Sequence, residues 1–253
     1  MHKPVSLIIG LGRDVGLACT RRLLEAGHDI LAADQRDELI DTVEKDFGEK
    51  VATYHGDLTT KLGVKNCLAA ADERFGRMDN LVVIPTISPP ASLADLDMAT
   101  LDKEVKITVR ASVLALKLFY QGLLAQDEED IASGIERRRQ KATITFILSA
   151  LSHQAQPGNF LESVSQNAVA GLVRASAVEL AADRIRCNAI ASLRPRAQET
   201  EPWLKQRTPM KRAALADEIA EALHYLVSPE AAIITGQILQ LDGGRSLLSG
   251  MLD

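Results

Sequence analysis

Short apolar runs alternate with amphipathic stretches along the whole chain. The runs lie at residues 5–9, 29–33, 51–54, 81–84, 144–148, 185–191 and 238–241. Between them, apolar residues recur with the helical period at residues 16–25, 39–47, 64–75, 101–124, 163–182 and 217–227. Near-continuous apolar strands that alternate with helices are typical of a parallel sheet covered on both faces. The pattern therefore predicts an α/β protein.

Composition supports an ordinary globular protein. The chain has 253 residues, of which 46% are hydrophobic and 25% are charged. These fractions exclude a disordered or fibrous chain. No internal repeat and no linker rich in Gly, Pro or Ser interrupts the pattern, so we expect one domain over residues 1–253. The net charge of −5 does not indicate the basic surface that a nucleic-acid-binding protein needs.

The cysteines and the apolar runs bear on compartment. Cys19, Cys67 and Cys187 are far apart and lack the spacing of a metal site, so we expect buried reduced thiols and no metal. No segment reaches the roughly 18 consecutive apolar residues of a membrane span. The run at 5–9 is too short for a secretory signal. We expect a cytoplasmic protein that binds neither membrane nor nucleic acid.

Residues 127–141 stand apart because they contain an acidic run followed by a basic run. Two interpretations are open. The segment is either a docking surface for a charged partner or the solvated tip of a helical hairpin. The opposite charges balance locally, which favours the solvated tip.

A glycine-rich loop, Gly10-Leu11-Gly12-Arg13-Asp14-Val15-Gly16, connects the first predicted strand to the first predicted helix. Glycines at this place let backbone N–H groups approach a pyrophosphate at a helix N-terminus, where the helix dipole favours anions. Asp14 occupies the centre of this loop. A carboxylate there competes with a phosphate for the same amides.

Two carboxylates follow the next two predicted strands. Asp34 follows the run at 29–33, where a carboxylate accepts a ribose 2′-hydroxyl and repels a 2′-phosphate. Asp57 comes shortly after the run at 51–54, near where an adenine ring would lie. Alternatively, each carboxylate only caps its own loop. Together with the glycine loop they predict NAD(P) binding with NAD favoured, a preference that Arg13 and Arg36 weaken because either could accept a 2′-phosphate.

Later segments resemble the short-chain dehydrogenase/reductase family, and the resemblance spans nearly all of the chain. It rests on these segments: Asp79-Asn80-Leu81-Val82, Ser149, Ile185-Arg186-Cys187-Asn188-Ala189-Ile190, Pro209-Met210-Lys211-Arg212, Thr235-Gly236-Gln237-Ile238 and Leu241-Asp242-Gly243-Gly244. The resemblance implies a Rossmann-type doubly wound parallel sheet of about seven strands with helices on both faces. It also implies a homo-oligomer, either a tetramer or a dimer.

Members of this family work through an Asn, a Ser, a Tyr and a Lys. The resemblance places the Ser on Ser149, which is retained, and the Asn on Thr108. It places the Tyr on Glu162 and the Lys on Gln166. None of the chain's three tyrosines lies in this segment. The proton relay of the family is therefore replaced.

The replacements leave several chemical roles open. To donate a proton, Glu162 would need its pKa raised by about two to three units through burial. Alternatively, Glu162 is a favourable carboxylate at a helix start without a catalytic role. Gln166 can hydrogen-bond ribose hydroxyls but carries no charge. His153 follows Ser149 on the same segment and is a second candidate acid or base, unless it is only a loop histidine.

Three functions follow, in order of preference. The first is an NAD(P)-dependent oxidoreductase with altered acid–base residues that acts on an unidentified small molecule. The second is a catalytically inactive protein that binds a nucleotide or serves as a scaffold. The third is non-redox chemistry on the same fold.

Overall fold

The strands form one parallel sheet of seven. In this computed structural model residues 3–86, 90–132, 141–193 and 206–248 are described, except for the side chains of Arg13 and Asp130. The strand order is β3-β2-β1-β4-β5-β6-β7, and every pairing is parallel. The strands are β1 (Val5–Ile9), β2 (Asp29–Asp34), β3 (Ala52–His55), β4 (Asn80–Val83), β5 (Ala142–Ser149), β6 (Ile185–Ser192) and β7 (Ile238–Leu241). The predicted sheet is confirmed, and each strand begins and ends within two residues of its predicted boundaries.

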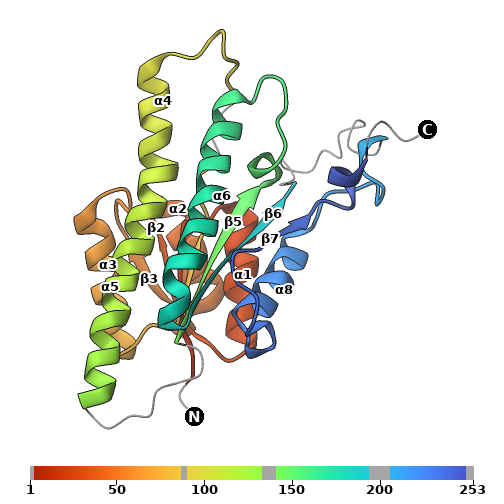
Figure 1. Cartoon of the computed structure of the whole chain (residues 1–253). Coiled ribbons are helices and arrows are strands. Elements are labelled where there is room, and N and C mark those ends of the chain that lie inside the picture. Colours follow the sequence, from red (N-terminus) through yellow and green to blue (C-terminus); the bar gives the residue numbers. More distant parts are fainter. Residues whose placement is uncertain (1–2, 87–89, 133–140, 194–205, 249–253) are drawn as a thin grey trace.

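Helices cover both faces of the sheet (Figure 1). On one face lie α3 (Lys61–Phe75), α5 (Ala111–Ala132) and α6 (Phe160–Leu180). On the other lie α1 (Arg13–Glu25), α2 (Asp37–Phe47) and α8 (Ala216–Val227). Alternate residues of the strands contribute to two separate apolar cores, as the period of two along a strand requires. The sheet is therefore buried on both sides, which explains its near-continuous apolar strands.

The helix predicted at residues 101–124 is longer than expected and is interrupted. It begins as α4 (Met98–Glu104), passes through a π-helical segment, Val105–Arg110, and continues as α5. Such π-helical turns occur frequently at functional sites, and sequence periodicity does not reveal them. Thr108 lies within this segment.

The same helix is apolar over much of its length. Met98–Glu129 is long and apolar enough to meet the length and composition of a membrane span: an 18-residue window within it has a mean hydropathy of 1.3, and 33% of that window is buried. A helix that packs on a sheet meets the same criteria. Here Phe119 and Leu123 are fully buried in the core of the sheet.

The charged segment at 127–141 is only partly described, because residues 133–140 lie outside the described residues. Asp127 lies near the end of α5 and pairs with Lys141 at 3.4 Å and with Arg184 at 3.6 Å. Lys141 is buried and comes directly before β5. The charges at the two ends of the segment therefore neutralise each other where they are described, and whether residues 133–140 form a solvated tip or a docking surface stays a prediction.

The topology fixes where a ligand can bind. The strand β1 lies between β2 and β4 in the sheet. After β1 the chain adds β2 and β3 on one side of it, and then crosses to add β4 and the later strands on the other side. In open α/β sheets, ligands bind at such a switch point, outside the carboxyl ends of the strands. The glycine loop leaves β1 at this point.

Candidate functional site

The glycine loop lies against the end of β4. Gly10 has a φ of 80°, and a Cβ there would come within 2.4 Å of the carbonyl oxygen of Ile84. Gly16 lies in the first turns of α1, and a Cβ there would come within 1.8 Å of the carbonyl oxygen of Leu11. Both contacts are with backbone, which cannot move aside. The loop therefore requires glycine at both positions to bring the start of α1 close to the sheet.

The other loop residues have different environments. Gly12 is the N-cap of α1 and has a φ of 48°. Val15 is buried in the core beneath α1, so its role is packing. Asp14 is exposed in the first turn of α1. The side chain of Arg13 lies outside the described residues.

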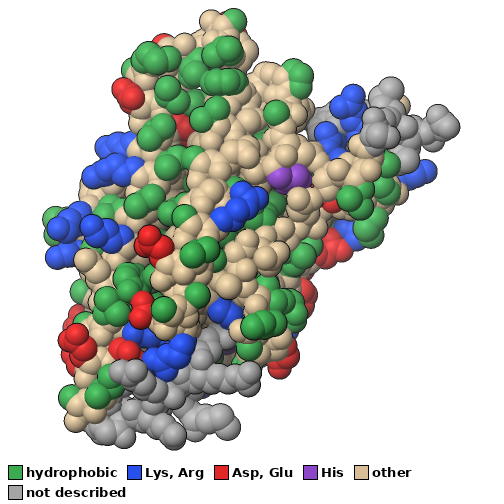
Figure 2. Space-filling view, viewed as in Figure 1, with side chains coloured by type: hydrophobic (Ala, Val, Ile, Leu, Met, Phe, Trp, Pro, Cys, Tyr) green, Lys and Arg blue, Asp and Glu red, His purple; other side chains and the backbone are tan. Residues whose placement is uncertain are grey.

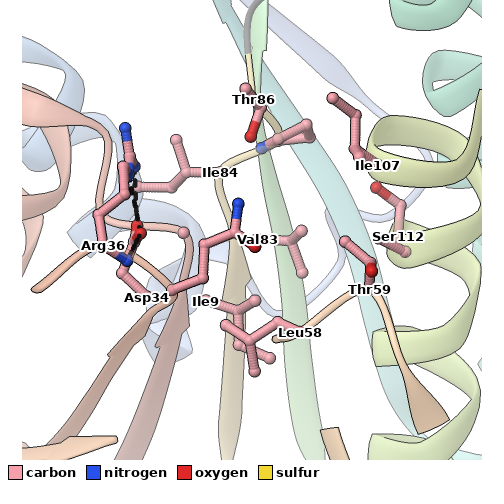
Figure 3. A pocket seen from close by; sticks show the side chains of 14 residues that line it. Ile9, Asp34, Arg36, Leu58, Thr59, Val83, Ile84, Thr86, Ile107 and Ser112 are labelled. Atoms are coloured by element: carbon pink, nitrogen blue, oxygen red, sulfur yellow. Dashed lines mark hydrogen bonds and ion pairs between the residues drawn. The ribbon is translucent and has the colours of Figure 1, made fainter. Parts of the chain in front are cut away.

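A pocket opens at the switch point, beside the glycine loop. Its empty volume is about 580 Å³, and it is open to solvent. Ile9, Gly10 and Val83 contribute from the ends of β1 and β4, and Leu58 and Thr59 contribute from the loop after β3. Figure 3 shows Asp34 and Arg36 on one side of the pocket and Ile107 and Ser112 on the opposite side. Its place and shape fit the adenosine half of a dinucleotide.

Asp34 is buried at the edge of this pocket, and all its hydrogen bonds are made within the chain. Its Oδ2 accepts from the backbone N–H of Leu11 at 2.8 Å and from Arg36 Nη2 at 2.8 Å. Its Oδ1 accepts from the backbone N–H of Arg36 at 3.0 Å and from Arg36 Nε at 2.8 Å. Burial opposes ionisation, but the hydrogen bonds from Arg36 and Leu11 lower the pKa of Asp34 below its ordinary value.

Asp57 lies close to the pocket but does not line it. Its carboxylate is exposed and accepts from the backbone N–H of Thr59 at 2.9 Å and from Thr59 Oγ1 at 2.7 Å, and these bonds lower its pKa. Leu58 and Thr59 line the pocket in its place. Here Asp57 caps its own loop, which was the alternative interpretation of the sequence.

Ser149 and Gln166 meet at the carboxyl end of β5. The backbone N–H of Ser149 donates to Gln166 Oε1 at 3.0 Å, and Ser149 Oγ accepts from the backbone N–H of Leu151 at 3.1 Å. Gln166 is completely buried, and its Nε2 has no hydrogen-bond partner among the described residues. A ribose hydroxyl could satisfy this N–H group, so the residues present fit a nicotinamide dinucleotide.

Glu162 and Thr108 are also buried. Glu162 lies in the first turn of α6, at 5% exposure, and α6 packs against the π-helical segment that carries Thr108. Thr108 Oγ1 donates to Glu104 Oε1 at 2.8 Å. Glu104 is itself buried, at 3% exposure. Two buried carboxylates thus lie on two helices that pack together near Ser149.

His153 lies just after the short helix Ala150–Ser152 that follows β5. Both of its ring nitrogens are buried and have no hydrogen-bond partner in the part of the chain that the structure describes, so it is not bonded to Ser149. Burial lowers its pKa, against the opposing attraction of Asp242. At neutral pH the imidazole is therefore neutral and can accept a proton.

The cysteines are buried free thiols, as predicted. Burial raises the pKa of Cys67 and of Cys187 to about 12, so neither thiol is nucleophilic at neutral pH. In the part of the chain that the structure describes, no three His, Cys, Asp or Glu side chains are grouped to hold a metal ion.

The structure brings the site residues into two groups. The glycine loop and Asp34 meet at the pocket, and Ser149 and Gln166 meet at the end of β5. Glu162 lies four residues before Gln166 on α6, and Thr108 lies on the π-helical segment that packs against α6. Sequence reasoning missed Glu104 and Ser112. A weak signal for them existed, because the polar residues Glu104, Thr108 and Ser112 recur every four residues and so share one face of the helix, which the structure shows to be buried.

Comparisons with known proteins agree with this geometry. A family model described as enoyl-(acyl carrier protein) reductase matches residues 10–246. The chain is 28% identical over 250 residues to the cis-4-hydroxycyclohexanecarboxylate dehydrogenase of Sinomonas cyclohexanicum, with 95% of each chain covered. It is 28% identical over 251 residues to the 2,5-dichloro-2,5-cyclohexadiene-1,4-diol dehydrogenase of Sphingobium indicum, with 94% of this chain and 95% of that one covered.

A solved structure is also similar over its full length. The crystal structure of 3-ketoacyl-(acyl-carrier-protein) reductase from Brucella melitensis, complexed with NADH, superposes with a TM-score of 0.86 at 25% identity. The match covers 97% of this chain and 99% of that one. With its sheet order, its glycine loop and these matches, the chain belongs to the short-chain dehydrogenase/reductase family of oxidoreductases.

Proposed function

We propose that this protein is an NAD(P)-dependent oxidoreductase that interconverts an alcohol and a carbonyl group on a small molecule with an altered set of acid–base residues. The observation that carries the proposal is one shared edge of the sheet. The adenosine pocket lies at the ends of β1, β2 and β4, and Ser149 lies at the end of β5 on the same edge. When bound, the dinucleotide supplies or accepts the hydride.

Ser149 is suited to hold the substrate oxygen. Its Oγ accepts from Leu151 N–H, and its own proton is not donated to any described residue. The hydroxyl is therefore oriented by the chain and can donate to a carbonyl oxygen. The bond from Ser149 N–H to Gln166 Oε1 fixes the end of β5 against α6.

Glu162 and His153 are the candidates for moving the proton. Glu162 is buried, which is the condition that the sequence analysis set for this carboxyl group to act as a proton donor. His153 has unpartnered ring nitrogens and a pKa lowered by burial, which suits a base. We assign Thr108 and Gln166 to positioning, because each bonds a neighbouring group of the site.

A catalytically inactive nucleotide-binding or scaffold protein is the second candidate. One observation favours it: the exposed carboxylate of Asp14 lies in the first turn of α1, where it opposes binding of a pyrophosphate. Non-redox chemistry on the same fold has no specific observation in its favour and stays last.

A fluorescence titration with NADH and NADPH is the first test of the proposal. Saturable binding of either supports it, and binding of neither overturns it. The second test measures turnover of cyclic alcohols, cyclic ketones and 3-oxoacyl thioesters, the classes suggested by the relatives. Under the proposal, Ser149→Ala lowers kcat by about 100-fold or more and leaves cofactor affinity unchanged. Cofactor binding without turnover of any substrate favours the inactive candidate.

We also propose that the protein forms a homo-oligomer, a dimer or a tetramer, through α5 and α6. Apolar side chains are exposed on both helices: Val113, Leu124, Ile131, Phe160, Val164 and Val178. Figure 2 shows apolar side chains spread over this face, with many of the charged ones toward its left edge and lower end. Light scattering of the purified protein measures the state. The cytoplasmic location stays a prediction.

A further inference from the structure

Arg36 changes the chemistry that the adenosine pocket offers to a ribose. A carboxylate at the end of β2 should present acceptors to the 2′- and 3′-hydroxyls of a ribose. In this chain each oxygen of Asp34 already accepts two hydrogen bonds, and two of the four come from the guanidinium of Arg36. A carboxylate has about four lone-pair sites, so Asp34 is saturated.

The guanidinium itself is only partly used. Its Nε and Nη2 each donate one hydrogen bond to Asp34. The other three of its five N–H groups make no hydrogen bond to a described residue. The side chain of Arg36 is 39% exposed, whereas that of Asp34 is 3% exposed. Both residues line the pocket (Figure 3). This side of the pocket therefore presents hydrogen-bond donors of Arg36 to a ligand, where the carboxylate of Asp34 was expected to present hydrogen-bond acceptors.

The negative charge of Asp34 is neutralised by the positive charge of Arg36. Asp34 is held ionised by its partners, and its hydrogen bonds to Arg36 raise the pKa of the guanidinium. A 2′-phosphate approaching the pocket meets the outer N–H groups of a cation before it meets the buried carboxylate. Guanidinium and phosphate form strong hydrogen bonds in two-point contacts.

Two nearby carboxylates oppose a phosphate. Asp37 and Glu38 begin α2, directly after Arg36. Asp37 lies 3.2 Å from His55 Nε2, and Glu38 lies within electrostatic range of Arg36. Their charges limit the gain from Arg36, so the expected outcome is loss of discrimination rather than a strong preference for a phosphate.

We propose that Arg36 removes the discrimination that Asp34 would impose, so that the pocket accepts NADPH and NADH with similar affinity. NADH must break the bonds from the guanidinium to reach Asp34, which weakens its binding. NADPH uses the free N–H groups of Arg36 and leaves the ion pair in place. This inference rests on the proposed function, because it concerns the cofactor of the same site.

The test is a fluorescence titration of the full chain with NADH and with NADPH. For the unmodified protein we expect dissociation constants within about tenfold of each other. In Arg36→Leu the carboxylate is released, so NADH binds more tightly and NADPH more weakly. The ratio of the two constants should shift by about 10- to 100-fold, the worth of a charge-assisted hydrogen bond. Arg36→Lys keeps the charge without the two-point contact, and its ratio should lie between the two.

A matched control is Arg74→Leu, which removes the same charge from an exposed position at the end of α3, outside the pocket. It should leave the ratio unchanged. If both dinucleotides bind but Arg36→Leu moves the ratio no more than Arg74→Leu does, the inference is wrong and the proposed function stands. A preference for NADH of more than 100-fold in the unmodified protein also overturns the inference. If neither dinucleotide binds, the proposed function fails, and the inference fails with it.

Discussion

Buried polar side chains are hydrogen-bonded to different extents at the two edges of the sheet. At the amino edge they bond one another. Ser6 Oγ and His28 Nδ1 lie 2.7 Å apart, Asn80 Nδ2 donates to Ser6 Oγ at 3.1 Å, and Thr143 Oγ1 donates to Asn80 Oδ1 at 2.7 Å. Asp79 accepts from Val5 N–H at 2.8 Å and pairs with Arg77. This network joins the starts of β1, β4 and β5.

At the carboxyl edge, several buried polar atoms have no hydrogen-bond partner among the described residues, although others there, such as the carboxylate of Asp34, are fully bonded. The atoms without such a partner are Ser152 Oγ, both ring nitrogens of His153, Gln166 Nε2, Ser192 Oγ and Thr208 Oγ1. A buried polar group without a partner costs about 1–3 kcal/mol, so a chain tolerates several only where another demand prevails. In parallel α/β sheets that demand is the ligand site at the carboxyl ends of the strands. From this difference we expect substitutions at the amino edge to lower stability most, and substitutions at the carboxyl edge to affect the proposed function.

The largest effect should follow from breaking the amino edge at Asp79. In Asp79→Ala the buried N–H of Val5 and the guanidinium of Arg77 lose their acceptor. Removal of one partner from a buried ion pair costs about 3–5 kcal/mol. Urea unfolding measures the change. Asp57→Ala is the control, because that carboxylate is exposed, and it should cost about 1 kcal/mol or less. Equal losses in the two variants would contradict the assignment.

A smaller effect should appear as a dependence of stability on pH. Burial, together with the charge of His224, lowers the pKa of His28 from 6.5 to about 4. The unfolded chain therefore binds a proton at this residue in the range where the folded chain does not. The contribution is complete above about pH 6.5 and is lost as the pH falls toward 4, by about 1–3 kcal/mol.

Urea midpoints between pH 7.5 and pH 4.5 measure this loss. His28→Gln should flatten the profile across that window, even if it lowers stability at every pH. His153→Gln removes the partly buried histidine of the carboxyl edge and should leave most of the slope in place. A slope that persists unchanged in His28→Gln would assign the acid sensitivity to other groups.

Much of this architecture could be predicted from the sequence. The strands of the sheet followed from their apolar runs, because strands buried on both faces admit few polar residues. The place of the glycine loop and of Asp34 followed from their position after the first two strands. Glycine is required at positions 10 and 16 because a Cβ there would collide with neighbouring backbone, and the glycine motif in the sequence already indicates that requirement.

Other features depend on how side chains meet in space. The bond of Arg36 to Asp34 required the turn into α2 to place a guanidinium over a carboxylate two residues earlier, and a sequence does not specify that rotamer. The π-helical segment has no signature in the apolar period. Asp57 bonds Thr59 through one carboxylate oxygen, a contact that depends on the loop conformation, and its predicted place near an adenine ring stays a prediction.

Thr108 and Glu104 are a buried bonded pair on the helix that covers this region of the protein, and they offer a further test. In Thr108→Val the buried carboxylate of Glu104 loses a donor, which should cost about 1–3 kcal/mol. Thr108→Ser keeps the hydroxyl and should restore most of that loss. Thermal or urea unfolding of the three proteins measures both changes. No rescue by serine would mean that the methyl group, through packing, carries the effect instead.

The smallest effect sharpens the comparison within one strand. Thr143 and Thr145 are both buried in β5. Among the described residues, the hydroxyl of Thr143 has a hydrogen-bond partner, Asn80, and that of Thr145 has none. Replacement by valine keeps the shape and removes the hydroxyl. Thr143→Val should therefore cost about 1 kcal/mol, because Asn80 Oδ1 loses its donor, whereas Thr145→Val should be neutral or stabilising. Equal losses measured by urea unfolding would mean that Thr145 has a partner in solution. The hydroxyl of Thr145, in the middle of β5, would then no longer count among the unpartnered buried groups.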